Sequence, residues 1–126
     1  MSKTIVKTDN APAAIGPYSQ GVVTNGLLFT SGQLPIDPAT GKIPEVSIGE
    51  KAAIVFKNLD AIAKEAGTTL DNAVKITVYL ADINNFAAVN EVYAQYFKEP
   101  FPARSAFQVA ALPLGADLEV EGVFQF

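Results

Sequence analysis

A single arginine, Arg104, lies in the segment P-A-R-S-A-F-Q at residues 102–108, and every other member of the nine Lys and Arg residues is a lysine. Arginine presents a planar fork of donors that matches a carboxylate or a phosphate, whereas lysine is sufficient for a solvated surface charge. The one arginine is placed within an apolar segment. This placement indicates that Arg104 recognises an anionic group.

Two carboxylates, Glu119 and Glu121, lie in the C-terminal segment L-E-V-E and alternate with apolar residues. In a strand this spacing puts both carboxylates on one face. A carboxylate close to an anion-binding arginine can act as a general base, and it can equally form a structural ion pair with that arginine. The pattern alone leaves both roles open, and it does not decide between the two glutamates.

The chain has no cysteine and no histidine. It therefore lacks the commonest general base, a thiolate nucleophile, a disulfide and the usual N and S ligands of transition metals. Any chemistry must use carboxylates, lysine, tyrosine, hydroxyls, arginine or backbone groups. We expect no metal site.

The composition favours one domain, residues 1–126, because a chain of 126 residues can bury a substantial core. Apolar residues make up 49% of the chain and charged residues only 17%, against about 25% in typical domains, which indicates self-association. The net charge is -4, and no basic cluster is present to follow a phosphate backbone. We expect no nucleic-acid partner.

The N-terminus M-S-K-T-I-V-K-T-D-N has no apolar signal core. No uninterrupted apolar run approaches the roughly 18 residues that a bilayer span requires. We expect a cytoplasmic protein without a membrane partner.

Local signals predict the elements that must position these residues. Strands are expected at 4–7, 20–24 and 27–33, and Asn25-Gly26 between the last two is typical of a type I′ hairpin turn. Ser47 and Glu50 form a capping box ahead of apolar residues at helical spacing, and Gly67 follows the last of them. The sequence therefore predicts a helix between Ser47 and Gly67.

The second half of the chain continues this α+β pattern. Alternation predicts a strand at 74–80, helical spacing predicts a helix from Phe86 to Phe97 ahead of the prolines, and strands are expected at 103–111 and 118–126. The order β-β-β-α-β-α-β-β predicts an α+β domain whose mixed sheet has both helices on one face.

The faces of the last two strands determine where Arg104 is expected. Phe107 and Val109 share one face of their strand, so Arg104 occupies the other. If the larger apolar residues pack under the helices, Arg104 and Glu119 both lie on the face that the helices leave uncovered.

Several motifs together resemble the RidA (YjgF/YER057c/UK114) family over essentially the whole chain. These motifs are G-P-Y-S-Q-G, F-T-S-G-Q-L-P, F-A-A-V-N, P-A-R-S with V-A-A-L-P, and L-E-V-E. The resemblance implies a fold like that of Bacillus chorismate mutase and a homotrimer with active sites between subunits.

The resemblance also implies an enzyme, a 2-iminobutanoate/2-iminopropanoate deaminase. Such an enzyme hydrolyses 2-imino acids, which arise from the enamines 2-aminoacrylate and 2-aminocrotonate released by pyridoxal-phosphate dehydratases, to 2-keto acids and ammonia. An iminium carbon is already electrophilic, so attack by water needs an oriented carboxylate and a base, without a cofactor.

Residue by residue, the resemblance gives Arg104 as the carboxylate binder and Glu119 as the residue that positions and activates water. It adds a set of substrate-binding residues, several of them reaching the pocket from a neighbouring subunit: Tyr18, Ser31, Gly32, Phe86, Asn90 and the backbone N–H of Ala106. The chain departs from the family pattern at Ala106, where a cysteine often stands, and at Ala111, where an arginine often stands.

These pocket residues also have structural readings. Tyr18 follows Gly-Pro as a turn aromatic would, Phe86 has the spacing of a core residue and Asn90 that of a polar helix face. Ser31 and Gly32 are suited to the end of a strand. The binding roles of these five residues rest on the resemblance.

Other functions remain open at this stage. A non-catalytic binder or sensor of 2-keto or 2-imino acids would use the same arginine but would have no need of Glu119. A chaperone-like role and the ribonuclease activity attributed to some relatives are further alternatives, and the acidic, histidine-free composition argues against the latter. The preferred imino acid and the dehydratase that supplies it are not determined.

Overall fold

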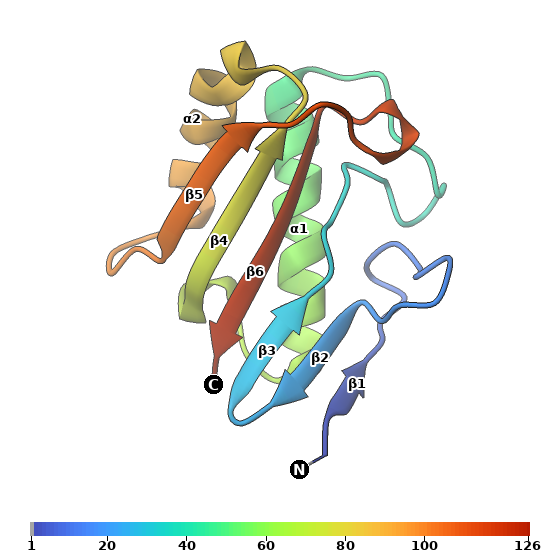
Figure 1. The fold of residues 1–126 in the computed structure, drawn as a ribbon, viewed down its shortest axis with the longest axis vertical. Helices are drawn as coiled ribbons and strands as arrows, with labels where there is room; N and C mark the ends of the chain where they lie inside the picture. Colours follow the sequence, from blue (N-terminus) through green and yellow to red (C-terminus); the bar gives the residue numbers. More distant parts are fainter. Residues whose placement is uncertain (1) are drawn as a thin grey trace.

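Six strands form one sheet in the order β1-β2-β3-β6-β4-β5, and two helices cross it (Figure 1). The computed structural model describes residues 2–126. Its elements are β1 (Thr4–Val6), β2 (Gly21–Thr24), β3 (Leu27–Thr30), α1 (Ile48–Ala66), β4 (Ala73–Leu80), α2 (Phe86–Tyr96), β5 (Ala103–Gln108) and β6 (Leu118–Gln125). Neighbouring strands are antiparallel except β4 and β5, which are parallel and joined through α2. The predicted order and the mixed sheet are confirmed.

Both helices pack on the same face of the sheet, as Figure 1 shows. Alternate residues of the central strands form the core with the apolar side of α1; fully buried members include Leu28, Ile76, Val120 and Phe124. The opposite face has no helix over it among residues 2–126.

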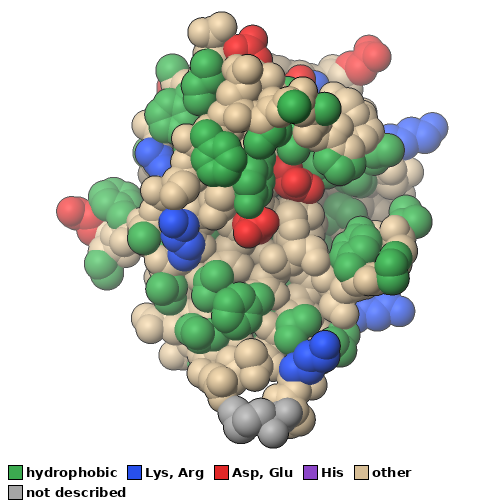
Figure 2. Space-filling model, viewed as in Figure 1, with side chains coloured by type: hydrophobic (Ala, Val, Ile, Leu, Met, Phe, Trp, Pro, Cys, Tyr) green, Lys and Arg blue, Asp and Glu red, His purple; other side chains and the backbone are tan. Residues whose placement is uncertain are grey.

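The uncovered face exposes large apolar side chains. Ile5 is 53% exposed, Phe29 43% and Phe107 45%. Figure 2 views the molecule from this side, and hydrophobic side chains lie over it in several patches around acidic groups near the middle.

Local signals produce the turns and helix ends that the sequence predicts. Asn25 and Gly26 both have positive φ, 51° and 75°, as a type I′ turn requires. The Ser47 Oγ accepts a hydrogen bond from the Glu50 N–H at 3.2 Å at the start of α1. Gly67 ends the helix in the left-handed region with φ 101°.

Some strand ends differ from prediction because a strand needs a partner. β3 stops at Thr30, which pairs with Gly21, the first residue of β2. β5 stops at Gln108, which pairs with the last residue of β4. The alternation predicts Val74 to lie on the buried face of its strand. A bulge between Ala73 and Lys75 leaves Val74 exposed instead.

Within residues 2–126, no helix has both the length and the apolar character that a membrane crossing needs.

Candidate functional site

Arg104 and Glu119 lie on opposite faces of the sheet, so the prediction that they share the uncovered face is wrong. Arg104 is in register with Ile76, which is buried under the helices, whereas Glu119 is in register with Tyr79 on the other face. The error concerns β5, which is the edge strand. Its large aromatic, Phe107, points away from the helices and packs edge-to-face on Tyr79, with ring centroids 5.3 Å apart. The arginine therefore takes the helix side.

Arg104 rests on one side of α2. Its Nη1 donates a hydrogen bond of 2.7 Å to the Asn90 Oδ1, and its guanidinium carbon lies 5.3 Å from the ring centroid of Phe86 and 4.6 Å from that of Tyr93. Ala106 follows on the same face of β5 and is half-buried against the core. We refer to Phe86, Asn90, Tyr93, Arg104 and Ala106 as the arginine half-site.

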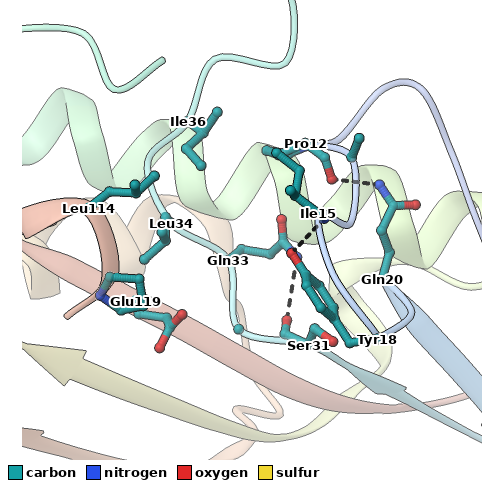
Figure 3. A pocket seen from close by; sticks show the side chains of 13 residues that line it. Pro12, Ile15, Tyr18, Gln20, Ser31, Gln33, Leu34, Ile36, Leu114 and Glu119 are labelled. Carbon is teal, nitrogen blue, oxygen red and sulfur yellow. Dashed lines mark hydrogen bonds between the residues drawn. The ribbon is translucent and has the colours of Figure 1, made fainter. Parts of the chain in front are cut away.

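Glu119 lines a separate cleft of about 570 Å³. The cleft lies between the end of β3, the loop that precedes β2 and the turn that precedes β6, with Tyr18 and Ser31 on one side and Glu119 on the other (Figure 3). We refer to Tyr18, Ser31, Gly32, Leu114 and Glu119 as the glutamate cleft. Four of the eight predicted site residues therefore meet here, and the other four meet in the arginine half-site.

The pairing of two backbone segments brings Gly32 against Glu119. After β3 ends, Gln33 pairs with Val120 through two hydrogen bonds of 2.8 and 3.1 Å. Gly32 consequently lies beside Glu119, and a Cβ on Gly32 would come within 2.7 Å of the Glu119 Cδ. Real Cβ atoms do not approach this closely, so the position of the carboxylate depends on glycine at 32.

The two hydroxyl residues of the cleft have defined partners. Ser31 donates its Oγ proton to the Ser19 carbonyl oxygen at 2.5 Å. The Tyr18 hydroxyl accepts a hydrogen bond of 3.3 Å from the Ile15 N–H (Figure 3), and Tyr18 as a whole residue is half exposed. Tyr18 is therefore the hydroxyl of the pair that is better placed to contact a ligand.

A buried amide and an ion pair hold the walls of the cleft. The Gln20 side chain accepts from the Thr8 N–H at 2.7 Å and donates to the Pro12 carbonyl at 2.8 Å, which fixes the N-terminal loop. Lys51 and Asp117 form an ion pair with Nζ and Oδ2 2.6 Å apart, which holds the chain before β6 to the first turn of α1. Glu119 follows two residues later.

Burial raises the pKa of the Glu119 carboxyl above its ordinary value, and the neighbouring Glu121 carboxylate raises that pKa further. No lysine or arginine lines the glutamate cleft among the residues described. Neither glutamate forms an ion pair with Arg104 within residues 2–126, so the structural ion pair that the sequence left open is not formed inside the chain. A carboxylate with a raised pKa and no cation beside it is suited to accept and return protons.

Tyr93 is the one residue of the arginine half-site that was not predicted from the sequence. It lies seven residues after Phe86 and three after Asn90, so helical spacing alone puts all three on one side of α2. That spacing was the available signal. The described part of the chain contains no group of three or more Asp, Glu, His or Cys side chains arranged to hold a metal ion.

The fold and the two half-sites define a small α+β protein that presents an exposed arginine on one face of its sheet and a half-buried carboxylate on the other. The chain belongs to the RidA family: the family model described as Endoribonuclease L-PSP matches residues 8–125.

Relatives agree over nearly the whole length. The human 2-iminobutanoate/2-iminopropanoate deaminase is 49% identical over 121 residues, which are 96% of this chain and 88% of the relative. The Rid-family protein YyfA from Yersinia pestis is 48% identical with a TM-score of 0.96, and the match covers 99% of this chain and 100% of that one. E. coli TdcF, solved with bound serine, is 41% identical with a TM-score of 0.92, and the match covers 98% of each chain.

Proposed function

We propose that this protein hydrolyses 2-imino acids, such as 2-iminopropanoate and 2-iminobutanoate, to 2-keto acids and ammonia. The observation that carries the proposal is the pair of half-sites, one able to bind a carboxylate and one holding a carboxylate base. Two comparisons support it: the human relative is named as a deaminase of these substrates, and TdcF has a serine bound.

The complete site requires two copies of the chain. The sheet separates Arg104 from Glu119 within one molecule, so one copy supplies the arginine half-site and its neighbour supplies the glutamate cleft. A head-to-tail contact of this kind, repeated in a closed ring, gives one site at each interface. We propose a homotrimer, as the resemblance implies. The exposed apolar side chains of the uncovered face, including Phe29 and Phe107, support burial in such an assembly.

Arg104 binds and orients the substrate carboxylate. A guanidinium has five N–H donors, and Asn90 uses only Nη1, so the others remain available for a two-bond contact with a carboxylate. The backbone N–H of Ala106 is a further donor on this edge strand. Binding also neutralises the charge that would repel a nucleophile from the adjacent imine carbon.

Glu119 then moves the protons. Its carboxylate takes a proton from water as the water oxygen bonds to the carbon of the protonated imine, which gives a neutral carbinolamine. Glu119 returns that proton to the nitrogen, the C–N bond breaks and ammonia leaves. The regenerated Glu119 carboxylate accepts the hydroxyl proton as the keto group forms, and then gives that proton to the departing ammonia. A raised pKa suits a residue that serves first as base and then as acid.

Two other readings are weaker. The family model is described as an endoribonuclease. A ribonuclease would need to bind negatively charged phosphodiesters in the glutamate cleft, where burial and the Glu121 charge already disfavour the ionised form of Glu119. A sensor of keto or imino acids would use the arginine half-site alone and leaves Glu119 without a role.

The test is direct hydrolysis. A serine dehydratase generates 2-aminoacrylate, and the decay of imine trapped by semicarbazide is followed with and without the protein. We expect accelerated imine loss and equal formation of pyruvate and ammonia. If the protein binds pyruvate but leaves the rate of imine loss unchanged, the sensor is the correct reading.

A further inference from the structure

Arg104 lies on a surface of α2 that Phe86, Asn90 and Tyr93 form together. Asn90 fixes one guanidinium nitrogen through a hydrogen bond of 2.7 Å, and the two rings lie 5.3 and 4.6 Å from the guanidinium carbon. The Tyr93 ring is the closer of the two. A cation over an aromatic face at such distances is attracted by the ring quadrupole, and the planar guanidinium also stacks on it.

Tyr93 is held far more firmly than a surface aromatic would be. It is 6% exposed, and its ring stacks on Phe97 with centroids 4.3 Å apart and meets Phe56 edge-on at 5.7 Å. These neighbours belong to the core. The ring is therefore a rigid support, in contrast to Asn90, whose side chain is exposed.

The hydroxyl of Tyr93 does not explain this placement. It is buried and has no hydrogen-bond partner among the described residues, so a ligand in the arginine half-site cannot reach it. Burial raises the pKa of the Tyr93 phenol, and the Arg104 charge only partly opposes that effect, so the phenol stays neutral. What Tyr93 presents to Arg104 is the face of its ring.

We infer that Tyr93 is a positioning residue for carboxylate binding: its ring fixes the guanidinium of Arg104 so that the donors not used by Asn90 face the substrate. The inference rests on the proposed function, since it assumes that Arg104 binds the carboxylate. An arginine side chain has several rotatable bonds, and a binding geometry that is already fixed loses less entropy when the ligand arrives. Loss of the ring should therefore weaken ground-state binding and leave the proton transfers of Glu119 unchanged.

Four variants separate this role from simple core packing. Tyr93→Phe keeps the ring and removes the unpartnered hydroxyl. Tyr93→Leu keeps an apolar side chain without an aromatic face, and Tyr93→Met is the alternative if the leucine variant does not fold. Phe124→Leu is the matched control, because Phe124 is a fully buried core ring that makes no aromatic contact with Tyr93 and no cation contact with Arg104 among the described residues.

The measurements are the KM and kcat of imine hydrolysis, the Kd of pyruvate by calorimetry, and Tm. We expect Tyr93→Leu to raise KM and the pyruvate Kd by about 2- to 30-fold, with kcat changed less. Tyr93→Phe should keep the wild-type KM and Kd, and Phe124→Leu should lower Tm while leaving both constants near wild type.

Three results overturn the inference. The first is wild-type pyruvate affinity in both Tyr93→Leu and Tyr93→Met. The second is a Tyr93→Phe variant that binds pyruvate as weakly as Tyr93→Leu. The third is a Phe124→Leu variant with the same rise in KM as Tyr93→Leu. The pyruvate measurement does not depend on catalysis: if wild type binds pyruvate and fails to hydrolyse imines, the deaminase proposal fails while Tyr93 is still tested. If wild type binds no pyruvate, the role of Tyr93 fails together with that of Arg104.

Discussion

Replacing Gly32 with alanine perturbs the proposed base without touching it. The added Cβ would lie 2.7 Å from the Glu119 Cδ and 2.8 Å from its Oε2, whereas ordinary van der Waals contacts are 3.4–4 Å. The carboxylate therefore has to move by about 1 Å, and a misplacement of that size in an active site costs on the order of 100-fold in rate. The φ of Gly32 lies outside the left-handed region, so the backbone accepts alanine without strain.

We therefore expect Gly32→Ala to lower kcat for 2-iminopropanoate by about 100-fold while the free energy of unfolding changes by about 1 kcal/mol or less. The assay is the semicarbazide competition with dehydratase-generated substrate, together with thermal unfolding. Gly49→Ala is the matched control: its Cβ would lie 3.5 Å from Val92 Cγ2, an ordinary contact, within α1. That variant should keep the wild-type rate and be more stable by roughly 0.5–1 kcal/mol.

Two outcomes would refute this reasoning. A Gly32→Ala enzyme with wild-type kcat would mean that the position of the Glu119 carboxylate does not limit the reaction, and Glu119 would lose its role as the base. A Gly32→Ala protein that is unfolded at the assay temperature would mean that the side chain of Glu119 cannot absorb the close contact by moving.

Further predictions concern both half-sites and the assembly. Arg104→Lys keeps the charge but loses the planar donor fork. Because each charge-assisted hydrogen bond is worth about 1.5–3 kcal/mol, KM should rise about 10- to 150-fold. An unchanged KM would exclude Arg104 as the carboxylate binder. Glu119 must be ionised to act as base, so kcat/KM should fall as pH drops through its raised pKa. Glu121→Gln removes a charge that raises this pKa, so it should move the acidic limb of the pH profile of kcat/KM to lower pH. An acidic limb that does not move contradicts the assignment of Glu119 as the base. The raised pKa means that the Glu119 carboxyl binds its proton more tightly in the folded state than in the unfolded state. The protonated carboxyl therefore adds stability that is lost as pH rises through the raised pKa. Glu119→Gln should remove this pH dependence of stability, measured by thermal unfolding across pH. Wild type should have the mass of three chains by light scattering, and Phe107→Glu on the uncovered face should shift it toward one chain and abolish hydrolysis; an active monomer would disprove the shared site.

Signals confined to a few neighbouring residues predicted much of the fold. Asn25-Gly26 determined the hairpin because both residues tolerate positive φ, and Ser47 and Gly67 marked the ends of α1 because each satisfies backbone groups of the adjacent turn. Alternation in β6 placed Glu119 on the uncovered face, since apolar residues on a central strand must face the core. Residue type alone singled out Arg104, whereas only the family motifs favoured Glu119 over Glu121.

The face of Arg104 could be decided only by the tertiary structure. Alternation shows that Arg104 and Phe107 lie on opposite sides of β5, but on an edge strand hydrophobicity does not determine which side meets the helices. The parallel pairing with β4 and the packing of α2 decide it. They place the arginine on the helix side of the sheet and the phenylalanine on the uncovered side. The contact of Gly32 with Glu119 likewise depends on pairing between segments far apart in the chain. Such positions result from long-range packing, which no local pattern encodes. For this reason the sequence singled out Arg104 and Glu119 as candidates but did not place them on opposite faces of the sheet.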